Sequence, residues 1–218
     1  MQTVVERLRR LYAGVVYDTM YFDMDLRNFT PGTTIKPLGR HAPRPLVGPA
    51  FTCVGQHLAD DKLLDDSVRL TMLQEMTPGC VQVIDGGDDL SVAHYGDISA
   101  RLARKAGAVG AVIRGHTRDA RMIRQIKFPV YCLGVTPVDA YGRWQIRAWQ
   151  KPIWLSPTVR AQPNDIIFAD NDGVLVIPHA KAEQICIHAE ARAVIEDKIR
   201  ADLEELTPEA LYSRHGRW

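Results

Sequence analysis

The sequence predicts a layered α/β sandwich with mixed sheets, closed by a C-terminal helix. Helical and strand-like segments alternate in the first half, strand-like segments dominate the second half, and a long helical segment follows them. The 218 residues suffice for one substantial core, because a chain of this size buries roughly 70% of its unfolded surface. We therefore expect one domain over residues 1–218, with an N-terminal helical segment over about 1–30 and a C-terminal helix over about 180–203.

The elements follow from periodicity and composition. Helical periodicity is found at residues 3–12, 62–75, 97–106 and 180–203. Short apolar, β-rich runs predict strands at 48–55, 80–85, 108–113, 129–133, 144–149, 165–169 and 173–177. Strand 80–85, helix 97–106 and strand 108–113 form one βαβ unit, whose strands we expect to be parallel with a right-handed crossover. The sequence Asn-Asp-Gly at 171–173 predicts a tight hairpin, so antiparallel pairing should take over in the second half.

Charge and composition exclude several classes of protein. The 27 basic and 26 acidic side chains leave a formal charge of +1, too balanced for binding that depends on nucleic-acid phosphates. The four cysteines stand singly in apolar runs, which favours buried, reduced thiols in an intracellular protein over a zinc or redox site. The charged N-terminus lacks a signal peptide's apolar block, and no apolar run has the length of a membrane span. We expect a cytoplasmic protein with neither a nucleic-acid nor a membrane partner.

The βαβ unit brings two loops to one edge of the predicted sheet. The chain leaves the first strand at residues 85–89 and enters the helix near Gly96 and Asp97. The helix, at about 1.5 Å per residue, and the returning strand, at about 3.3 Å per residue, cover similar distances. The return ends in Arg118 and Asp119. We therefore expect both side chains near Asp97, in the crevice where open α/β sheets most often hold ligands.

The residue types at this edge suit an anionic ligand and a divalent cation. Unpaired N–H groups at Asp97, Ile98 and Ser99 can bind a carboxylate. Arg118 can hold a carboxylate or enolate oxygen in a planar fork, and Asp119 offers the hard oxygen that Mg²⁺ or Mn²⁺ prefers. Asp97 could then orient or deprotonate a water. The same residues also fit a turn in which Asp97 caps a helix and Arg118–Asp119 is a surface ion pair.

Asp97, a gap of twenty residues and Arg118-Asp119 resemble the D-x20-R-D signature of the class II pyruvate aldolases. These enzymes cleave 4-hydroxy-4-methyl-2-oxoglutarate and 4-carboxy-4-hydroxy-2-oxoadipate, and they share their fold with the ribonuclease regulator RraA. The resemblance implies a β/β/α sandwich related to phosphohistidine swivelling domains. It covers most of residues 45–200 through VGPAFTCVG at 47–55, PGCVQVIDGG at 78–87, YGDISARLARKAGAVGAVIRGHTRD at 95–119, FPVYCLGVTP at 128–137 and PNDIIFADNDGVLVIP at 163–178.

The resemblance implies a divalent-metal-dependent lyase that cleaves a 4-hydroxy-2-keto acid to pyruvate and a second carbonyl product. Oxaloacetate decarboxylation would be a side activity, because it passes through the same enolate. Asp119 would bind Mg²⁺, Mn²⁺ or another divalent cation, with waters completing the shell. Arg118 would hold the substrate near its keto oxygen, and Asp97 would act on the catalytic water.

The resemblance also implies a carboxylate site and an assembly. Backbone amides in the turn of Gly96, Ile98 and Ser99 would bind the pyruvyl carboxylate. Such enzymes form homotrimers or homohexamers with sites between subunits, and a glutamate from the neighbour's C-terminal helix supports the metal waters. Glu196 is the best match to that glutamate. The regulator branch typically lacks an acidic residue at the position of Asp97, so its presence here favours catalysis.

Alternatives remain open from the sequence. The chain could be a non-catalytic RraA-type regulator of a ribonuclease, or another metal-dependent lyase or hydrolase acting on a sugar-acid derivative. Arg114, where the family commonly has an acidic residue, either selects a more acidic substrate or forms an outer ion pair. His94 and His116 flank the crevice as acid–base groups or as ordinary hydrogen-bonding residues. Lys105, a conceivable Schiff-base nucleophile, is expected to face solvent.

Other clusters have simpler interpretations. The aspartates at 60, 61, 65 and 66 fit helix capping and solvation better than a metal cluster. Those at 165, 170 and 172 are expected to form turns around the late hairpin. The tryptophans at 144, 149 and 154 are expected to pack sheets or an interface, with no ligand assigned.

Overall fold

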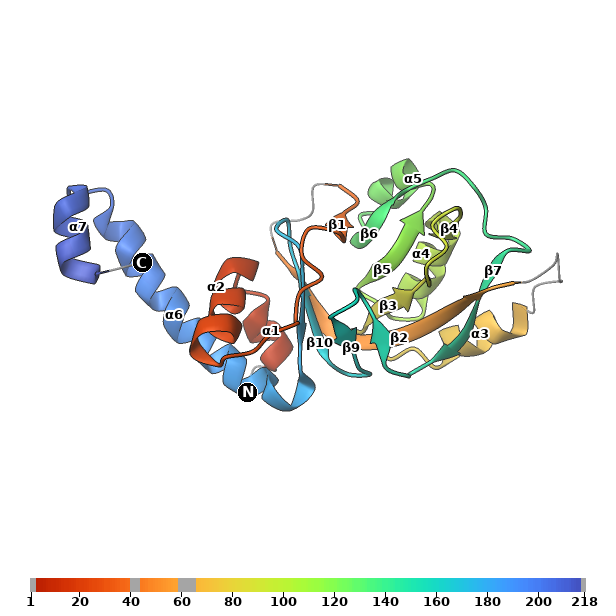
Figure 1. The fold of residues 1–218 in the computed structure, drawn as a ribbon, viewed down its shortest axis with the longest axis horizontal. Coiled ribbons are helices and arrows are strands. Elements are labelled where there is room, and N and C mark those ends of the chain that lie inside the picture. The colour runs from red at the N-terminus through yellow and green to blue at the C-terminus, as the bar shows by residue number, and fades with distance from the viewer. Residues whose placement is uncertain (1–2, 40–43, 59–65, 217–218) are drawn as a thin grey trace.

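The fold, given by a computed structural model, is described for residues 3–39, 44–58 and 66–216 (Figure 1). The helices are α1 Val4–Leu8, α2 Ala13–Asp18, α3 Asp66–Gln74, α4 Asp97–Lys105, α5 Ala120–Gln125, α6 Ala182–Asp202 and α7 Pro208–His215, with a π-helical turn at Thr19–Asp23 and a 3-10 turn at His179–Lys181. The strands are β1 Lys36–Pro37, β2 Leu46–His57, β3 Val81–Asp85, β4 Ala93–Tyr95, β5 Gly110–Thr117, β6 Val130–Val135, β7 Trp144–Trp149, β8 Ile153–Trp154, β9 Arg160–Ala161, β10 Ile166–Ala169 and β11 Val174–Ile177.

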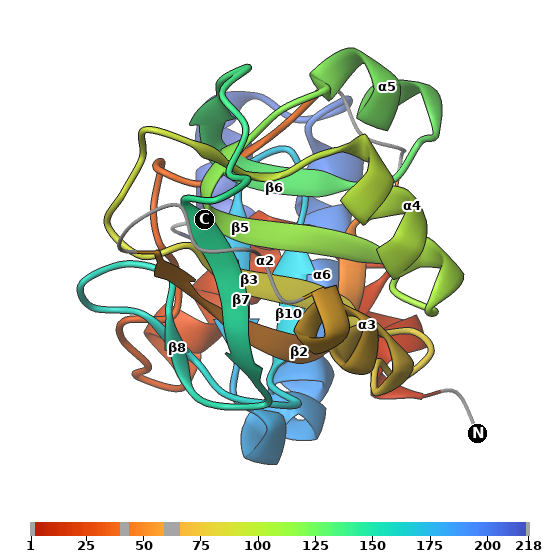
Figure 2. The same ribbon diagram turned by 90° about the vertical axis from the view of Figure 1, so that its right-hand side faces the viewer.

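Two sheet layers face each other across an apolar interior. The strands β6, β5, β3 and β2 lie side by side in that order, and β2 continues into β10 and β11. Val81 and Val83 of β3 pack with Ile167 and Val174, so the β10–β11 hairpin folds over one face of the sheet. Helices α3, α4 and α5 cover the other face (Figure 2), while α1, α2 and α6 cover the outer side of the hairpin. This arrangement confirms the predicted layered sandwich with a C-terminal helix.

Strand β2 belongs to both layers. Its start, from Leu46 to Pro49, pairs antiparallel with β10, its middle pairs parallel with β3, and its end pairs antiparallel with β7. The register with β7 shifts between Val54 and Gly55. Gly55 lies under the ring of Trp144, since an added Cβ would stand 1.7 Å from a ring carbon. A glycine is therefore required where the strand passes beneath this ring.

The predicted βαβ unit and hairpin are both confirmed. Strands β3 and β5 are parallel, with Val81 opposite Gly110 and Asp85 opposite Arg114. Strands β10 and β11 are antiparallel. Asp165 and Asp170 form turns as predicted, since they accept the N–H groups of Gln162 and Asp172. They also accept the N–H groups of His179 and Ala13 from outside these turns.

The N-terminal helices pack on the C-terminal helix. Arg7 of α1 donates to Glu190 of α6 at 2.6 and 2.9 Å and also pairs with Glu183. The far part of α6 extends beyond the body of the molecule with α7 at its end (Figure 1), and Val194, Ile195 and Leu203 are exposed there. All four cysteines are buried free thiols, as predicted. No described helix combines the length and the apolar character needed to span a bilayer.

Several predicted boundaries are wrong. The helix expected over 3–12 is shorter than predicted, because α1 ends at Leu8 and residues 9–11 form a turn before the extended Tyr12 and α2. The strand expected over 108–113 continues to Thr117, where it pairs with β4 and β6. The helix expected over 62–75 is described only from Asp66, and the aspartates at 60, 61 and 65 lie outside the described residues.

Candidate functional site

A pocket of about 520 Å³ lies at the carboxyl ends of the parallel strands. One side is formed by the start of α4, by Arg118 and Asp119 after β5, and by the loop that follows β6. The other side comes from α3, β3 and β7. The structure thus brings Asp97, Arg118 and Asp119 together at the edge where the sequence predicts them, and their chemical roles stay predictions.

Hydrogen bonds between backbone segments fix this edge. The N–H of Arg118 donates to the carbonyl of Tyr95 at 2.8 Å, and the buried hydroxyl of Thr117 donates to the same carbonyl at 3.0 Å. The N–H of Asp97 donates to Oδ2 of Asp119 at 3.3 Å. Gly96 packs so closely that an added Cβ would lie 2.8 Å from Oδ2 of Asp119. The start of α4 and the Asp119 carboxylate are therefore held against each other.

Asp119 adopts a left-handed backbone conformation, with φ of 57°. Such a conformation is uncommon outside glycine and costs of order 1–3 kcal/mol, although Asp and Asn tolerate it best. Its carbonyl accepts the N–H groups of Met122 and Ile123, which begins α5. The chain thereby turns away at once, and the Asp119 side chain, 36% exposed, stays at the pocket.

Arg118 lies between two carboxylates. Its Nε is 3.5 Å from Oδ2 of Asp119, and its Nη1 is 2.9 Å from Oδ2 of Asp139. Oδ1 of Asp139 accepts the N–H of Tyr141 at 3.2 Å, and Asp139 forms a bridge with Ala93. Sequence reasoning missed Asp139. Asp139 could have been found from its position after β6, because β6 is parallel to β5 and ends at the same edge of the sheet.

The inner part of the pocket is buried. The Tyr95 hydroxyl donates to Oε1 of Gln82 at 3.1 Å, and the Gln82 amide nitrogen contacts sulfur atoms of Met72 and Cys53. Trp144 packs in the core, as predicted, and its Nε1 donates to the carbonyl of Gly86 at 2.9 Å. Its ring also lines the pocket, which the sequence did not reveal.

His94 is a buried pocket residue, 6% exposed. Its ring meets that of Trp144 edge-on, with centroids 4.9 Å apart. Nδ1 accepts the N–H of His116 at 3.2 Å, so the proton of the neutral ring is on Nε2. Nε2 has no hydrogen-bond partner within the described part of the chain. Burial lowers the pKa of His94, which keeps the ring neutral near pH 7.

We expect His94 to make folding less stable in mild acid. Its native pKa lies below the unfolded value of about 6.5, so the unfolded chain binds more protons between these two pKa values. The free energy of unfolding therefore falls as pH drops through that window. His94→Asn keeps an acceptor for the His116 N–H and removes the titration. Urea unfolding at about pH 7.5 and about pH 5.5 should show a smaller loss in the variant. An equal loss in both proteins contradicts this assignment.

Other predicted residues lie outside the pocket. Arg114 pairs with Asp85 at 2.6 Å and with Asp88, so the structure favours the outer ion pair over a substrate contact. Nδ1 of His116 lies 2.8 Å from the carbonyl of Leu90. Lys105 is exposed on α4, as predicted.

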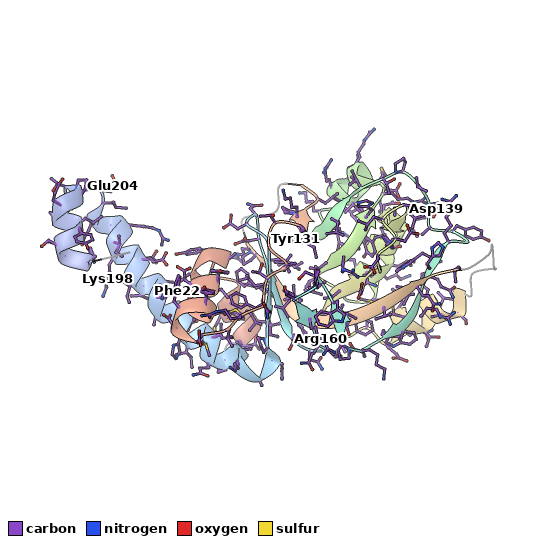
Figure 3. All side chains as sticks on the ribbon, in the orientation of Figure 1. Phe22, Tyr131, Asp139, Arg160, Lys198 and Glu204 are labelled. Carbon is purple, nitrogen blue, oxygen red and sulfur yellow. The ribbon has the colours of Figure 1, made fainter. Side chains whose placement is uncertain are left out.

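Glu196 does not join the pocket within one chain. It accepts hydrogen bonds from the Tyr12 hydroxyl and from Arg200, the latter at 2.7 Å. Figure 3 places Lys198, on the same helix, at the opposite end of the molecule from Asp139. Its suggested role in a neighbour's site stays a prediction.

The donor set fits a hydrated hard cation. No group of three His, Cys, Asp or Glu side chains that could enclose a metal occurs among the described residues. Mg²⁺ does not need such a cage, because it usually binds one or two carboxylates and keeps several waters. Asp119 offers a partly exposed carboxylate at the pocket, with Asp97 and Asp139 lining the same side.

Comparison with known proteins gives a consistent family match. A model of the RraA-like family, described as Aldolase/RraA, matches residues 14–176. The chain is 35% identical to "Putative 4-hydroxy-4-methyl-2-oxoglutarate aldolase" of Halalkalibacterium halodurans, covering 83% of this chain and 86% of that protein. It is 30% identical to "Protein DlpA" of Legionella pneumophila over 77% of this chain, which spans 26% of that longer protein. The crystal structure of Streptomyces coelicolor RraAS2, described as an unusual member of the RNase ES inhibitor RraA family, matches with a TM-score of 0.76 and 25% identity, covering 90% of this chain and 95% of that one.

Proposed function

Because this chain belongs to the RraA-like family, we propose that it is a divalent-metal-dependent lyase that cleaves a 4-hydroxy-2-keto acid to pyruvate and a second carbonyl product. The observation that carries the proposal is the meeting of Asp97, Arg118 and Asp119 in one pocket. These residues are separated along the chain and are held together by the Asp97–Asp119 and Arg118–Tyr95 hydrogen bonds. A surface ion pair alone needs neither the pocket nor the left-handed turn at Asp119.

Each group has a distinct task in this proposal. The N–H groups at the start of α4, at Ile98 and Ser99, bind the pyruvyl carboxylate, helped by the helix dipole. Arg118, oriented by Asp139, holds the keto oxygen with its guanidinium fork. Asp97 lies at the same side of the pocket, with its carboxylate 3.1 Å from Arg101, and accepts the hydroxyl proton through a water.

The cleavage balances without an added reactant. The C3–C4 bond breaks, its electron pair stays on C3 to form the enolate of pyruvate, and the C4 hydroxyl loses its proton to become the carbonyl of the second product. The enolate is then protonated at C3. A divalent cation beside Asp119 supplies the positive charge that favours the enolate. Oxaloacetate decarboxylation gives the same enolate and is the proposed side activity.

A coupled pyruvate-release assay tests the proposal. We expect Mg²⁺ or Mn²⁺ to support pyruvate formation from oxaloacetate and from 4-hydroxy-2-keto acids, and EDTA to lower the rate at least about 10²-fold. Excess Mg²⁺ after EDTA should restore it. The rival function is a non-catalytic regulator that binds a ribonuclease. It predicts that no substrate yields pyruvate faster than in the same metal solution without protein, and that EDTA has the same effect with and without protein.

We also propose that copies of this chain assemble as a homotrimer or homohexamer. The support is the part of α6 that extends from the body and exposes Val194 and Ile195, with the exposed Leu203 directly after its end (Figure 1). Glu196, on this part of α6, would then lie near a neighbour's pocket. Light scattering of the purified protein measures the assembly, and a monomer at all concentrations contradicts it.

A further inference from the structure

We infer that the preferred substrate carries an uncharged, largely apolar group at C4, such as an alkyl or phenyl group, rather than a second carboxylate. This inference rests on the proposed function and names its substrate class. The second product would be an uncharged aldehyde or ketone. Charge is distributed unequally between the two sides of the pocket.

The charged side of the pocket is already matched to the pyruvyl half of the substrate. Asp97, Asp119 and Asp139 stand here with Arg118, so the carboxylates outnumber the cation. Arg118 is shared between Asp119 and Asp139. The carboxylates of this side would neutralise a bound divalent cation, and Arg118 and the cation would neutralise the pyruvyl carboxylate. Little positive charge is then left on this side to bind a further carboxylate.

The opposite side consists of Arg69, Met72 and Leu73 of α3, Gln82 and Ile84 of β3, and residues 144–146 of β7. Arg69 is the one charged residue among them, and we call the others the neutral wall. Met72, Ile84 and Gln82 are 1–3% exposed and Trp144 is 6% exposed, so these residues of the wall are buried in the core. Placing a carboxylate against it without a cation is costly, whereas an apolar group gains about 0.8 kcal/mol for each buried methylene.

Room for such a group is present. The pocket volume of about 520 Å³ lies within the range of roughly 300–1,000 Å³ found for drug-sized ligands, and pyruvate has only three carbons. Arg69 of α3 also lines the pocket, but its side chain is exposed. Within the described lining, Arg69 and Arg118 are the only cationic side chains, so Arg69 is the residue against which the inference must be tested.

Two pocket groups await an uncharged polar partner. Nε2 of His94 and Oε1 of Gln145 are buried and have no hydrogen-bond partner among the described residues. The neutral His94 ring supplies one N–H donor, and Gln145 supplies one acceptor. A hydroxyl group can use both a donor and an acceptor, whereas a carbonyl oxygen can use only the donor, and neither pocket group supplies the charge that a carboxylate needs. The C4 hydroxyl of the substrate therefore fits both groups, and the carbonyl of the product fits the His94 N–H.

A matched pair of substrates tests the inference on the native protein. With Mg²⁺ present, pyruvate release is measured from 4-hydroxy-2-oxo-4-phenylbutanoate and from 4-hydroxy-4-methyl-2-oxoglutarate, and the rate for the latter is halved because each cleavage gives two pyruvates. We expect kcat/KM for the phenyl compound to be at least about tenfold higher. A preference for the second carboxylate overturns the inference. If that preference disappears in Arg69→Ala, Arg69 binds the carboxylate.

A charge placed on the neutral wall gives an independent test. Leu73→Lys should lower the phenyl-to-carboxylate ratio of kcat/KM at least about tenfold. Leu70→Lys is the matched control, because Leu70 is on the same helix, is 56% exposed and does not line the pocket. It should leave the ratio within about twofold. Equal shifts in both variants contradict the inference.

Oxaloacetate distinguishes a failure of the proposed lyase function from a failure of the inference about the C4 group. Its decarboxylation uses the charged side of the pocket and needs no group at C4. If metal-dependent decarboxylation is absent, the proposed lyase function fails. If decarboxylation is present but the carboxylate substrate is preferred, only the substrate inference fails.

Discussion

Replacing Arg118 by lysine should lower kcat/KM for pyruvate formation at least about 10²-fold, which corresponds to about 2.7 kcal/mol of transition-state stabilisation. Arg118 meets Asp139 through Nη1 and Asp119 through Nε. In the proposed function it also holds the keto oxygen. A single ammonium cannot reproduce this planar arrangement. Arg118→Ala should cost at least as much. Steady-state pyruvate release with oxaloacetate and a 4-hydroxy-2-keto acid measures both.

Arg104→Lys serves as the control for this substitution. Arg104 is on α4 and donates to the carbonyl of Ile126 at 3.0 Å, outside the pocket. Its replacement should leave turnover close to that of the native protein. Circular dichroism should show that all three variants fold. Near-normal turnover of Arg118→Lys would mean that the fork geometry has no role in the reaction.

Asp119→Asn should abolish both pyruvate formation and its stimulation by Mg²⁺, with a loss of at least about 10³-fold, or about 4 kcal/mol. The change removes the negative charge while keeping the size of the side chain. Asparagine also tolerates the left-handed backbone with φ of 57°, so the turn into α5 should survive. The rate is measured across a Mg²⁺ titration, and thermal unfolding reports the stability.

Asp88→Asn is the matched control for Asp119. Asp88 pairs with Arg114 and its side chain is 95% exposed, outside the pocket. Its variant should keep the native dependence on Mg²⁺. If Asp119→Asn still gives Mg²⁺-stimulated pyruvate release, the cation binds elsewhere and the proposed role of Asp119 is wrong.

The long, periodic elements could be predicted from the sequence, and the short ones could not. The βαβ unit, the late hairpin and α6 each repeat their pattern over enough residues to be recognised. Strands β1, β8 and β9 have two residues each, and two residues show no alternation. The end of α1 at Leu8 was hidden because Leu8 and Leu11 are both buried and keep the apolar spacing of a continuous helix.

For the candidate site, the order of strands and helices along the chain predicted which residues meet, whereas contacts between distant segments could not be predicted. Parallel strands end at one edge, so the closeness of Asp97 to Arg118 and Asp119 follows from topology. Asp139 and Gln145 reach the pocket from a loop and from β7, whose pairing with the end of β2 depends on side chains packing across distant segments. Within the described residues, Nε2 of His94 has no partner because of the atoms that surround it, and a sequence does not show which atoms these are.

Because β2 belongs to both sheet layers, the protein cannot be shortened to one layer without exposing part of this strand. A chain that stops before residue 163 retains the charged side and the neutral wall of the pocket, yet it loses β10 and β11. The segment from Leu46 to Pro49 then loses its β10 partner and becomes an exposed edge strand, which can pair with a strand of another molecule. Precipitation, rather than a damaged pocket, is therefore the expected fate of such a fragment.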